Sequence, residues 1–123
     1  MISVKQTKFG KEGNCLAACL ASLLEVDINL FPDISQEPSL WLSKINKYLI
    51  AEYELYLFPI TLSDLEEAFQ IMEDTIFIGS GYSNRGLFHA TLWKNGKMIF
   101  DSHPDNTGIK KLESLDFLVK YFK

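Results

Sequence analysis

Two cysteines four residues apart are the first residues in this 123-residue sequence whose spacing suggests chemistry. Cys15 lies at the start of GNCLAACLASLLE, residues 13–25, whose apolar residues recur at helical spacing. A thiol at a helix N-terminus loses its proton more easily, because unpaired backbone N–H groups and the helix dipole favour negative charge there. We therefore predict that Cys15 is a nucleophile, with a structural thiol as the alternative. Cys19, one turn later among apolar residues, is predicted to be an ordinary buried residue.

A base for this thiol is expected in the two alternating segments around Asn95-Gly96, FHATLW (residues 88–93) and KMIFDS (residues 97–102). A two-residue turn would leave Asp101 on the opposite face from His89. A three-residue loop over residues 94–96, with Gly96 in a bulge, would place His89 directly opposite Asp101. We predict the three-residue loop, because it also brings a consistent apolar set to the other face: Ala90, Leu92, Met98 and Phe100.

In this register the carboxylate of Asp101 can accept a hydrogen bond from one ring nitrogen of His89, which fixes the tautomer and tilt of the imidazole. The other ring nitrogen is then free to face Cys15, and a thiolate beside an imidazolium has a lowered pKa. Attack on a carbonyl also creates an oxyanion that needs hydrogen-bond donors. Candidate donors are the backbone N–H of Cys15 and the side-chain amides of Gln6 and Asn14.

A glutamine, a Gly-Asn-Cys opening the first long helix, a distant histidine leading one strand and an aspartate ending the next together resemble the papain-like cysteine peptidase superfamily. Its small bacterial and phage branches, akin to bacteriocin-processing and peptidoglycan-cleaving peptidases, are nearest in size. The resemblance spans nearly the whole chain. It implies an α+β fold in which the N-terminal helix carrying the cysteine packs on an antiparallel β-sheet, with additional helices. It also implies that Cys15 is the nucleophile, His89 the base, Asp101 the orienting residue and Gln6 the oxyanion-hole residue.

Local patterns assign the whole chain, residues 1–123, to a single domain. Beyond the first helix and the hairpin, they predict further elements, which are helices over residues 39–48, 61–72 and 112–122 and strands over residues 53–60 and 75–79. A glycine-rich loop, GSGYSNRG, is predicted at residues 79–86.

Several polar residues are candidates for substrate contact. Tyr82, Asn84 and Arg85 belong to the glycine-rich loop that leads directly to His89. His103 follows the second strand of the hairpin, and its alternative is an ordinary loop residue. Asn14 precedes the cysteine and completes this set.

Composition and charge limit the partners and the location that we expect. Twelve basic and sixteen acidic residues give a formal charge of -4, so nucleic acid is not an expected partner. The N-terminal residues lack the apolar run of a signal peptide, and no stretch approaches the roughly 18 consecutive apolar residues of a membrane span. We therefore expect a cytoplasmic location and no membrane partner. Two cysteines one helical turn apart form a poor disulfide framework, so we expect reduced thiols.

These features predict a thiol hydrolase or acyl transferase that cleaves a peptide or other amide bond in a peptide or protein substrate, with no cofactor. Peptide cleavage, deamidation and transamidation all use this core. The alternative is a papain-like binding or inhibitor module without activity. A zinc site is disfavoured because zinc-binding cysteines usually come from turns; its ligands would be Cys15, Cys19, His89 and His103. GSGYSNRG lacks the Lys-Ser or Lys-Thr ending of a phosphate-binding loop.

Overall fold

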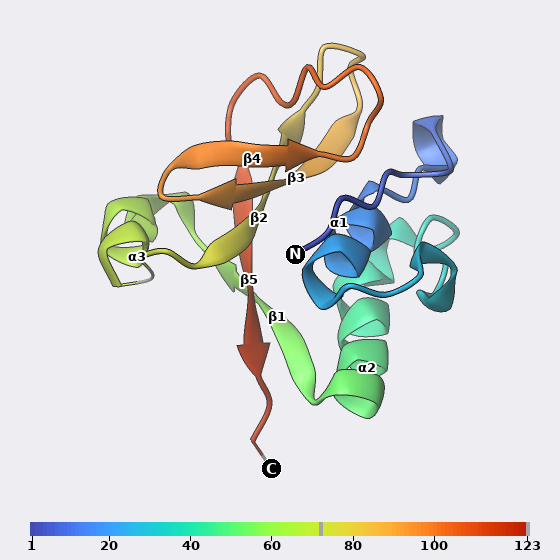
Figure 1. Ribbon diagram of the computed structural model, residues 1–123, viewed down its shortest axis with the longest axis horizontal. Coiled ribbons are helices and arrows are strands. Elements are labelled where there is room, and N and C mark those ends of the chain that lie inside the picture. Colours follow the sequence, from blue (N-terminus) through green and yellow to red (C-terminus); the bar gives the residue numbers. More distant parts are fainter. Residues whose placement is uncertain (72, 123) are drawn as a thin grey trace.

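The structure is a computed structural model that describes residues 1–71 and 73–122. Its centre is a five-stranded antiparallel sheet. The strand order is β1-β5-β2-β3-β4, and each neighbouring pair is antiparallel. The strands are β1 (Leu55–Ile60), β2 (Ile76–Tyr82), β3 (Phe88–Lys94), β4 (Lys97–Asp101) and β5 (Ser114–Lys120). Together with the helices around it (Figure 1), this sheet confirms the expected α+β class and antiparallel arrangement.

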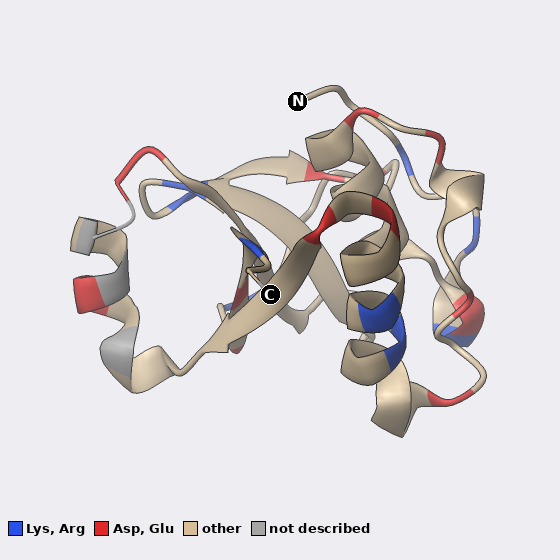
Figure 2. Ribbon diagram, turned by 90° about the horizontal axis from the view of Figure 1, so that it is seen from below, with Lys and Arg blue, Asp and Glu red and all other residues tan. Residues whose placement is uncertain are grey.

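Helices α1 (Cys15–Leu24) and α2 (Trp41–Tyr53) cover one face of the sheet, and α3 (Leu65–Ile71) lies against the other (Figures 1 and 2). Short 3-10 turns accompany them at Gly10–Glu12, Ile28–Leu30, Pro38–Leu40 and Leu62–Asp64. The helix expected over residues 39–48 starts and ends later, as α2. The helix expected over residues 61–72 includes residue 72, which lies outside the described residues. Within residues 1–71 and 73–122, the helices are too short or too polar to cross a bilayer.

The sheet has one half of the main core on each face, and a separate small cluster is formed by Ala18, Ala21 and Ile28. The half under α1 and α2 contains Cys19, Leu20, Ile45, Leu49, Leu57, Ile78, Ala90, Leu92 and Phe100. The half under α3 contains Phe77, Leu115 and Phe117. Full burial of one large apolar side chain contributes about 1.5–3 kcal/mol, so the first half holds α1 firmly against β3. This contact positions the N-terminus of α1 at the beginning of β3.

The C-terminal segment, expected as a helix over residues 112–122, is strand β5 in the middle of the sheet. Leu115 and Phe117 pack in the core half under α3, whereas Leu118 packs in the half under α1 and α2. A strand covered on both faces carries apolar residues on both sides, so its period of two is hidden. The helix prediction was wrong for this reason.

The hairpin of β3 and β4 differs from the expected three-residue loop. Lys94 pairs with Lys97, so the turn has only two residues, Asn95 and Gly96, both at positive φ. The extra residue lies inside β4 instead, because Leu92 pairs with Phe100 while the next residue of β3 pairs with Met98. The strand therefore bulges at residue 99, and Met98 leaves the expected apolar face.

The bulge decides which side of the hairpin Asp101 occupies. Without it, a two-residue turn would pair Asp101 with Ala90 and point its side chain away from the face of His89. With it, Asp101 pairs with Thr91. Because His89 and Thr91 are two residues apart on one strand, all three side chains share a face. The expected shared face is present, but the predicted direct opposition of His89 and Asp101 is wrong.

The glycine-rich segment is only partly a loop. Residues 79–82 continue β2 and pair with β3, so the strand is longer than the expected 75–79, and the connection covers residues 83–87. Gly81 lies opposite His89, and a Cβ at this position would come within 2.1 Å of the backbone oxygen of Lys111. The glycine is therefore required by close approach of the chain rather than by a turn.

Candidate active site

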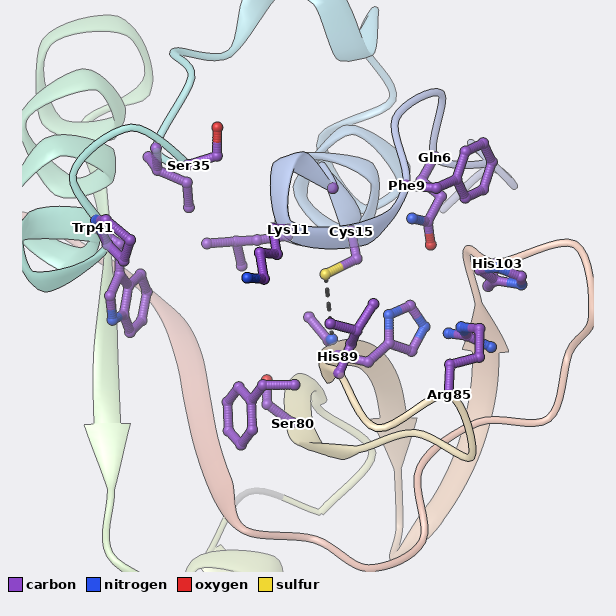
Figure 3. Close-up of a pocket in the computed structure, with 18 of the residues that line it drawn as sticks. Gln6, Phe9, Lys11, Cys15, Ser35, Trp41, Ser80, Arg85, His89 and His103 are labelled. Atoms are coloured by element: carbon purple, nitrogen blue, oxygen red, sulfur yellow. Dashed lines mark hydrogen bonds between the residues drawn. The ribbon is translucent and has the colours of Figure 1, made fainter.

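Cys15 is the first residue of α1, and its sulfur lies at the beginning of β3 (Figure 3). Its Sγ accepts a hydrogen bond of 3.4 Å from the backbone N–H of Ala90. The pairing of β3 with β4 stops at Thr91 and Asp101, so the next N–H along β3 is available to the thiol. The N–H of Leu16, in the first turn of α1, is a second backbone donor to the sulfur. These donors stabilise a negative charge on the sulfur.

His89 is 3% exposed and lies between Cys15 and Asp101. Its Nε2 is 2.6 Å from Oδ1 of Asp101, so the nitrogen that remains for the thiol is Nδ1. The hydrogen bond to the carboxylate fixes the ring orientation and favours the protonated ring. Cys15, His89 and Asp101 thus form a continuous chain of interacting side chains, although they come from a helix and two strands.

Asp101 is itself held by backbone donors. Its Oδ1 accepts the N–H of His103 at 2.9 Å, and its Oδ2 accepts the N–H of Gly108 at 2.8 Å. Gly108 has a φ of +70°, and a Cβ there would come within 2.8 Å of the sulfur of Met98. A left-handed, crowded position of this kind favours glycine. The carboxylate therefore has a fixed position as well as a fixed partner.

The pKa values of Cys15, His89 and Asp101 are all shifted toward the charged forms of these side chains. Burial raises the pKa of Cys15, but the hydrogen bonds from His89 and Ala90 and the charge of His89 outweigh it, so the net pKa lies below 9.0. Burial lowers the pKa of His89, but the interactions with Cys15 and Asp101 outweigh it and raise the pKa. Burial also opposes ionisation of Asp101, yet its hydrogen bonds lower its pKa. The arrangement favours a thiolate beside an imidazolium.

Gln6 lines the same pocket as Cys15, and its side chain contacts Ser102, the residue after Asp101. Its side chain is buried; Nε2 donates to the backbone oxygen of Lys8 at 2.9 Å, and Oε1 accepts from Oγ of Ser102 at 3.1 Å. These bonds fix the amide while leaving one N–H of Nε2 for another acceptor. The structure therefore brings Gln6 to the site, as the sequence interpretation expected.

The side chain of Asn14 is held by hydrogen bonds to the N-terminal segment. Asn14 occupies the N-cap position of α1 but forms no side-chain cap bond. Its Oδ1 accepts the N–H groups of Thr7 and Lys8, both at 3.0 Å, and its Nδ2 donates to Oγ1 of Thr7 at 2.9 Å. Asn14 thus ties the N-terminal segment, including Gln6, to the start of α1.

A pocket of about 640 Å³ opens beside the sulfur of Cys15. Two of the expected contact residues line it, Arg85 and His103. Arg85 forms an ion pair with Asp105, and the backbone N–H of Asp105 donates to Nδ1 of His103 at 3.1 Å. The two others lie elsewhere: Tyr82 is the last residue of β2, 54% exposed and in edge contact with Phe88, and Asn84 lies in the exposed connection.

Other residues of the pocket were missed by the sequence interpretation, chiefly Phe9, Trp41, Ser80, Ser114 and Asp116. Ser114 and Asp116 lie on β5, which the sequence pattern presented as a helix. Asp116 carried a signal, since a single acidic residue inside LDFLV is unusual for a buried segment.

Cys19 lies in the core half under α1 and α2, with no exposed surface, and burial raises its pKa well above 9.0. In the described part of the chain, no group of three or more His, Cys, Asp or Glu side chains is placed to hold a metal ion. The two thiols of one helix therefore differ in environment: Cys15 is partly exposed and its pKa is lowered, whereas Cys19 is buried and its pKa is raised. A comparison with protein-family models, with curated proteins and with solved structures finds no match, so the interpretation of this site depends on its geometry.

Proposed function

We propose that this chain is a thiol hydrolase or acyl transferase of papain-like type that acts on an amide bond in a peptide or protein. The observation that carries the proposal is the hydrogen-bonded order Cys15, His89, Asp101 beside an open pocket. Each residue has the environment its role needs: a thiol with a lowered pKa, an imidazole held by a carboxylate, and a carboxylate held by backbone N–H groups. The α+β fold with the cysteine on an N-terminal helix also supports the papain-like assignment.

The reaction starts with the Cys15 thiolate, which attacks the carbonyl carbon of the amide and forms a C–S bond. The C–N bond then breaks, and Nδ1 of the His89 imidazolium gives its proton to the leaving amine. Water, or an amine in a transfer reaction, attacks the resulting thioester while His89 takes its proton. The thiolate leaves, and the imidazolium is restored. Asp101 keeps its charge throughout and orients the ring.

The oxyanion of the tetrahedral intermediate has two donors within this arrangement. One is the backbone N–H of Cys15, which lies in the first turn of α1, where N–H groups have no intrahelical acceptor. The other is Nε2 of Gln6, whose second N–H is free after the bond to Lys8. Both belong to residues that line the pocket. Fixed donors of this kind stabilise developing charge without reorganisation.

We place the enzyme in the cytoplasm. Both cysteines are free, which agrees with a compartment that keeps thiols reduced. The acidic net charge of the chain agrees with a peptide or protein substrate rather than a nucleic acid.

Alkylation kinetics test the proposal, with Cys19 as an internal control. At neutral pH, iodoacetamide should label Cys15 much faster than Cys19 or free cysteine, as followed by mass spectrometry of the two peptides. His89→Ala should slow the labelling of Cys15, because the thiol then loses the imidazolium that stabilises its charge. A peptidyl electrophile should label Cys15 alone. Equally slow labelling of both thiols in the folded protein would instead identify a binding module without activity.

A further inference from the structure

A buried carboxylate without a partner lies in the same pocket as Cys15. The side chain belongs to Asp116, which is 6% exposed and lines the 640 Å³ pocket. Among the described residues it receives no hydrogen bond and forms no ion pair. Burial, with no neighbouring charge to offset it, raises the pKa of Asp116 from 3.8 to about 6. No fully buried side-chain nitrogen or oxygen in the described residues lacks a hydrogen-bond partner, so the unpaired oxygens of Asp116 open into the pocket. Buried acidic side chains are normally paired, and a partner for this one can reach it from the pocket.

Strand register places Asp116 on the same face of the sheet as the helix that carries Cys15. Ala90, the donor to the sulfur, pairs with Ser80, and Ser80 pairs with Ser114. Asp116 is two residues beyond Ser114 and therefore on the same face. Two strand spacings and two residues along a strand put Asp116 roughly 12 Å from Ala90. An extended substrate rises about 3.3 Å per residue, so a long side chain a few residues from the attacked bond reaches this carboxylate.

The pocket that Asp116 lines contains groups that suit a cation. Ser80 and Ser114 line the pocket next to it and offer hydroxyl oxygens as further acceptors. Trp41 and Phe88 supply aromatic surface in the same pocket, and aromatic faces attract ammonium and guanidinium groups. In Figure 3, Trp41 and Ser80 lie on one side of Cys15, whereas Arg85 and His103 lie on the other.

The pocket's own basic side chains leave this carboxylate free. Arg85 is bound to Asp105 at the other end of the pocket. Lys11 also lines the pocket, yet it forms no ion pair with Asp116 among the described residues. An uncharged or acidic substrate group in this place would leave the carboxylate buried and unpaired, which is costly, whereas a cation would pair with it.

We propose that Asp116, Ser80, Ser114 and Trp41 form a subsite for a positively charged side chain, lysine or arginine, near the amide bond that Cys15 attacks. This subsite rests on the proposed function and names its substrate class. The subsite defines the direction in which a substrate lies in the pocket. Its cationic side chain lies toward β5 and α2, and another part of the substrate lies at the end formed by Arg85 and His103.

A set of acetyl-tripeptidyl acyloxymethyl ketones tests the subsite on the full chain. Two positions carry glycine, and the third carries lysine, its uncharged analogue norleucine, or glutamate, with each position varied in turn. The rate of Cys15 labelling is measured by intact-protein mass spectrometry. For one position, lysine should label about 10- to 100-fold faster than norleucine, the range expected for a charged hydrogen bond, and glutamate should be slowest.

Asp116→Asn tests whether the preference comes from this carboxylate. The substitution keeps the shape of the side chain, and the ratio of lysine to norleucine rates within the variant should fall close to one. Using a ratio removes any general change in thiol reactivity. Glu66→Gln, which removes the same charge from an exposed position on α3, should keep the full preference.

The outcomes separate the subsite from the proposed function. If iodoacetamide and every ketone label Cys15 as slowly as a buried thiol, the enzymatic function itself is overturned. If Cys15 is reactive but lysine and norleucine ketones react equally at all positions, the subsite is wrong and the enzymatic function stands. A lysine preference that survives in Asp116→Asn would also overturn the subsite, because another group would then recognise the cation.

Discussion

His89 and Asp101 are diagonal neighbours across β3 and β4, joined by a 2.6 Å contact between Nε2 and Oδ1. The residue directly opposite Asp101 is Thr91, and the bulge at residue 99 puts the carboxylate on the face of the imidazole. Diagonal neighbours are farther apart than directly opposed ones but remain within reach of long or aromatic side chains. The imidazole therefore spans the distance from the start of β3 to the end of β4.

Asp101→Asn should shift the pH dependence of Cys15 alkylation to higher pH. The substitution removes the negative charge that raises the pKa of His89. A ring that loses its proton more easily supplies less positive charge to Cys15, whose pKa then rises toward its ordinary value. The measurement is the iodoacetamide rate between pH 5 and pH 10 for the wild type, Asp101→Asn and Glu66→Gln. Coincident inflections in all three would show that the carboxylate does not act on the thiol.

Gly108→Ala should weaken the activation of Cys15, because the backbone N–H of Gly108 holds the carboxylate of Asp101 in place. An alanine here strains a left-handed residue and comes within 2.8 Å of the sulfur of Met98, so the backbone of residue 108, whose N–H binds Asp101, shifts. Gly96→Ala is a matched control, because Gly96 has a similar φ of +77° and nothing within 4 Å of a Cβ. Both variants should lose roughly 1–2 kcal/mol of stability.

Only Gly108→Ala should also slow the alkylation of Cys15. Thermal denaturation and iodoacetamide kinetics on the two variants separate the two effects. If both glycine variants keep the wild-type labelling rate, the backbone bond from Gly108 to Asp101 is not needed for thiol activation.

Gln6→Ala should slow acylation while sparing alkylation. Reaction with p-nitrophenyl acetate passes through a tetrahedral oxyanion, whereas iodoacetamide reacts at a saturated carbon and forms none. Loss of one oxyanion donor lowers an acylation rate by about 100- to 1000-fold. Ser102→Ala is the control: it removes the hydroxyl bound to Oε1 of Gln6 but leaves the amide in place, so its effect should be smaller. Equal losses in both reactions would mean that Gln6 acts only by holding the fold.

Asp116→Asn should make the folded protein more stable at neutral pH. The pKa of Asp116 is about 6 in the folded state and near 3.8 when exposed, so the folded state binds more protons between these values. Stability from this group is therefore greatest below pH 4, falls as the pH rises to 6 and stays low above it. The penalty above pH 6 is on the order of 1–3 kcal/mol.

The measurement is the difference in Tm between Asp116→Asn and the wild type at pH 4 and pH 7.5. The gain should be small at pH 4, where both side chains are neutral, and clear at pH 7.5. A constant difference at both values would contradict a buried, unpaired carboxylate. If Asp116→Asn gains stability and loses the preference for a cation, Asp116 lowers the stability of the fold but serves binding, which is a known trade-off between stability and function.

Several features of the site could be predicted from local sequence. Cys15 before an apolar helical pattern indicated a thiol at a helix N-terminus, and the alternation around His89 indicated a strand. Gln6 was a candidate oxyanion donor because of its side-chain amide and because of the resemblance, and the structure brings it to the pocket through the tie of Asn14 to the N-terminal segment.

Other features depend on long-range partners. The turn at Asn95-Gly96 accepts more than one loop length, and the choice of register depends on which side chains the neighbouring strands and α1 can bury. Residues 114–120 are a strand because β1 and β2 supply hydrogen bonds on both sides, which a local pattern does not contain. Asp116 was missed for the same reason: an acidic residue in a presumed helix reads as exposed.

The sequence by itself determined the helix that begins at Cys15, the strand that carries His89 and the chemical identity of the candidate reacting groups, because these follow from local periodicity and side-chain chemistry; the α+β class came from the resemblance. The tertiary structure alone decided the bulge that orients Asp101, the central place of β5 and the unpaired carboxylate of Asp116. The physical reason is that strand pairing and burial are set by residues far away in the chain, whereas helix starts and strand alternation are set by near neighbours.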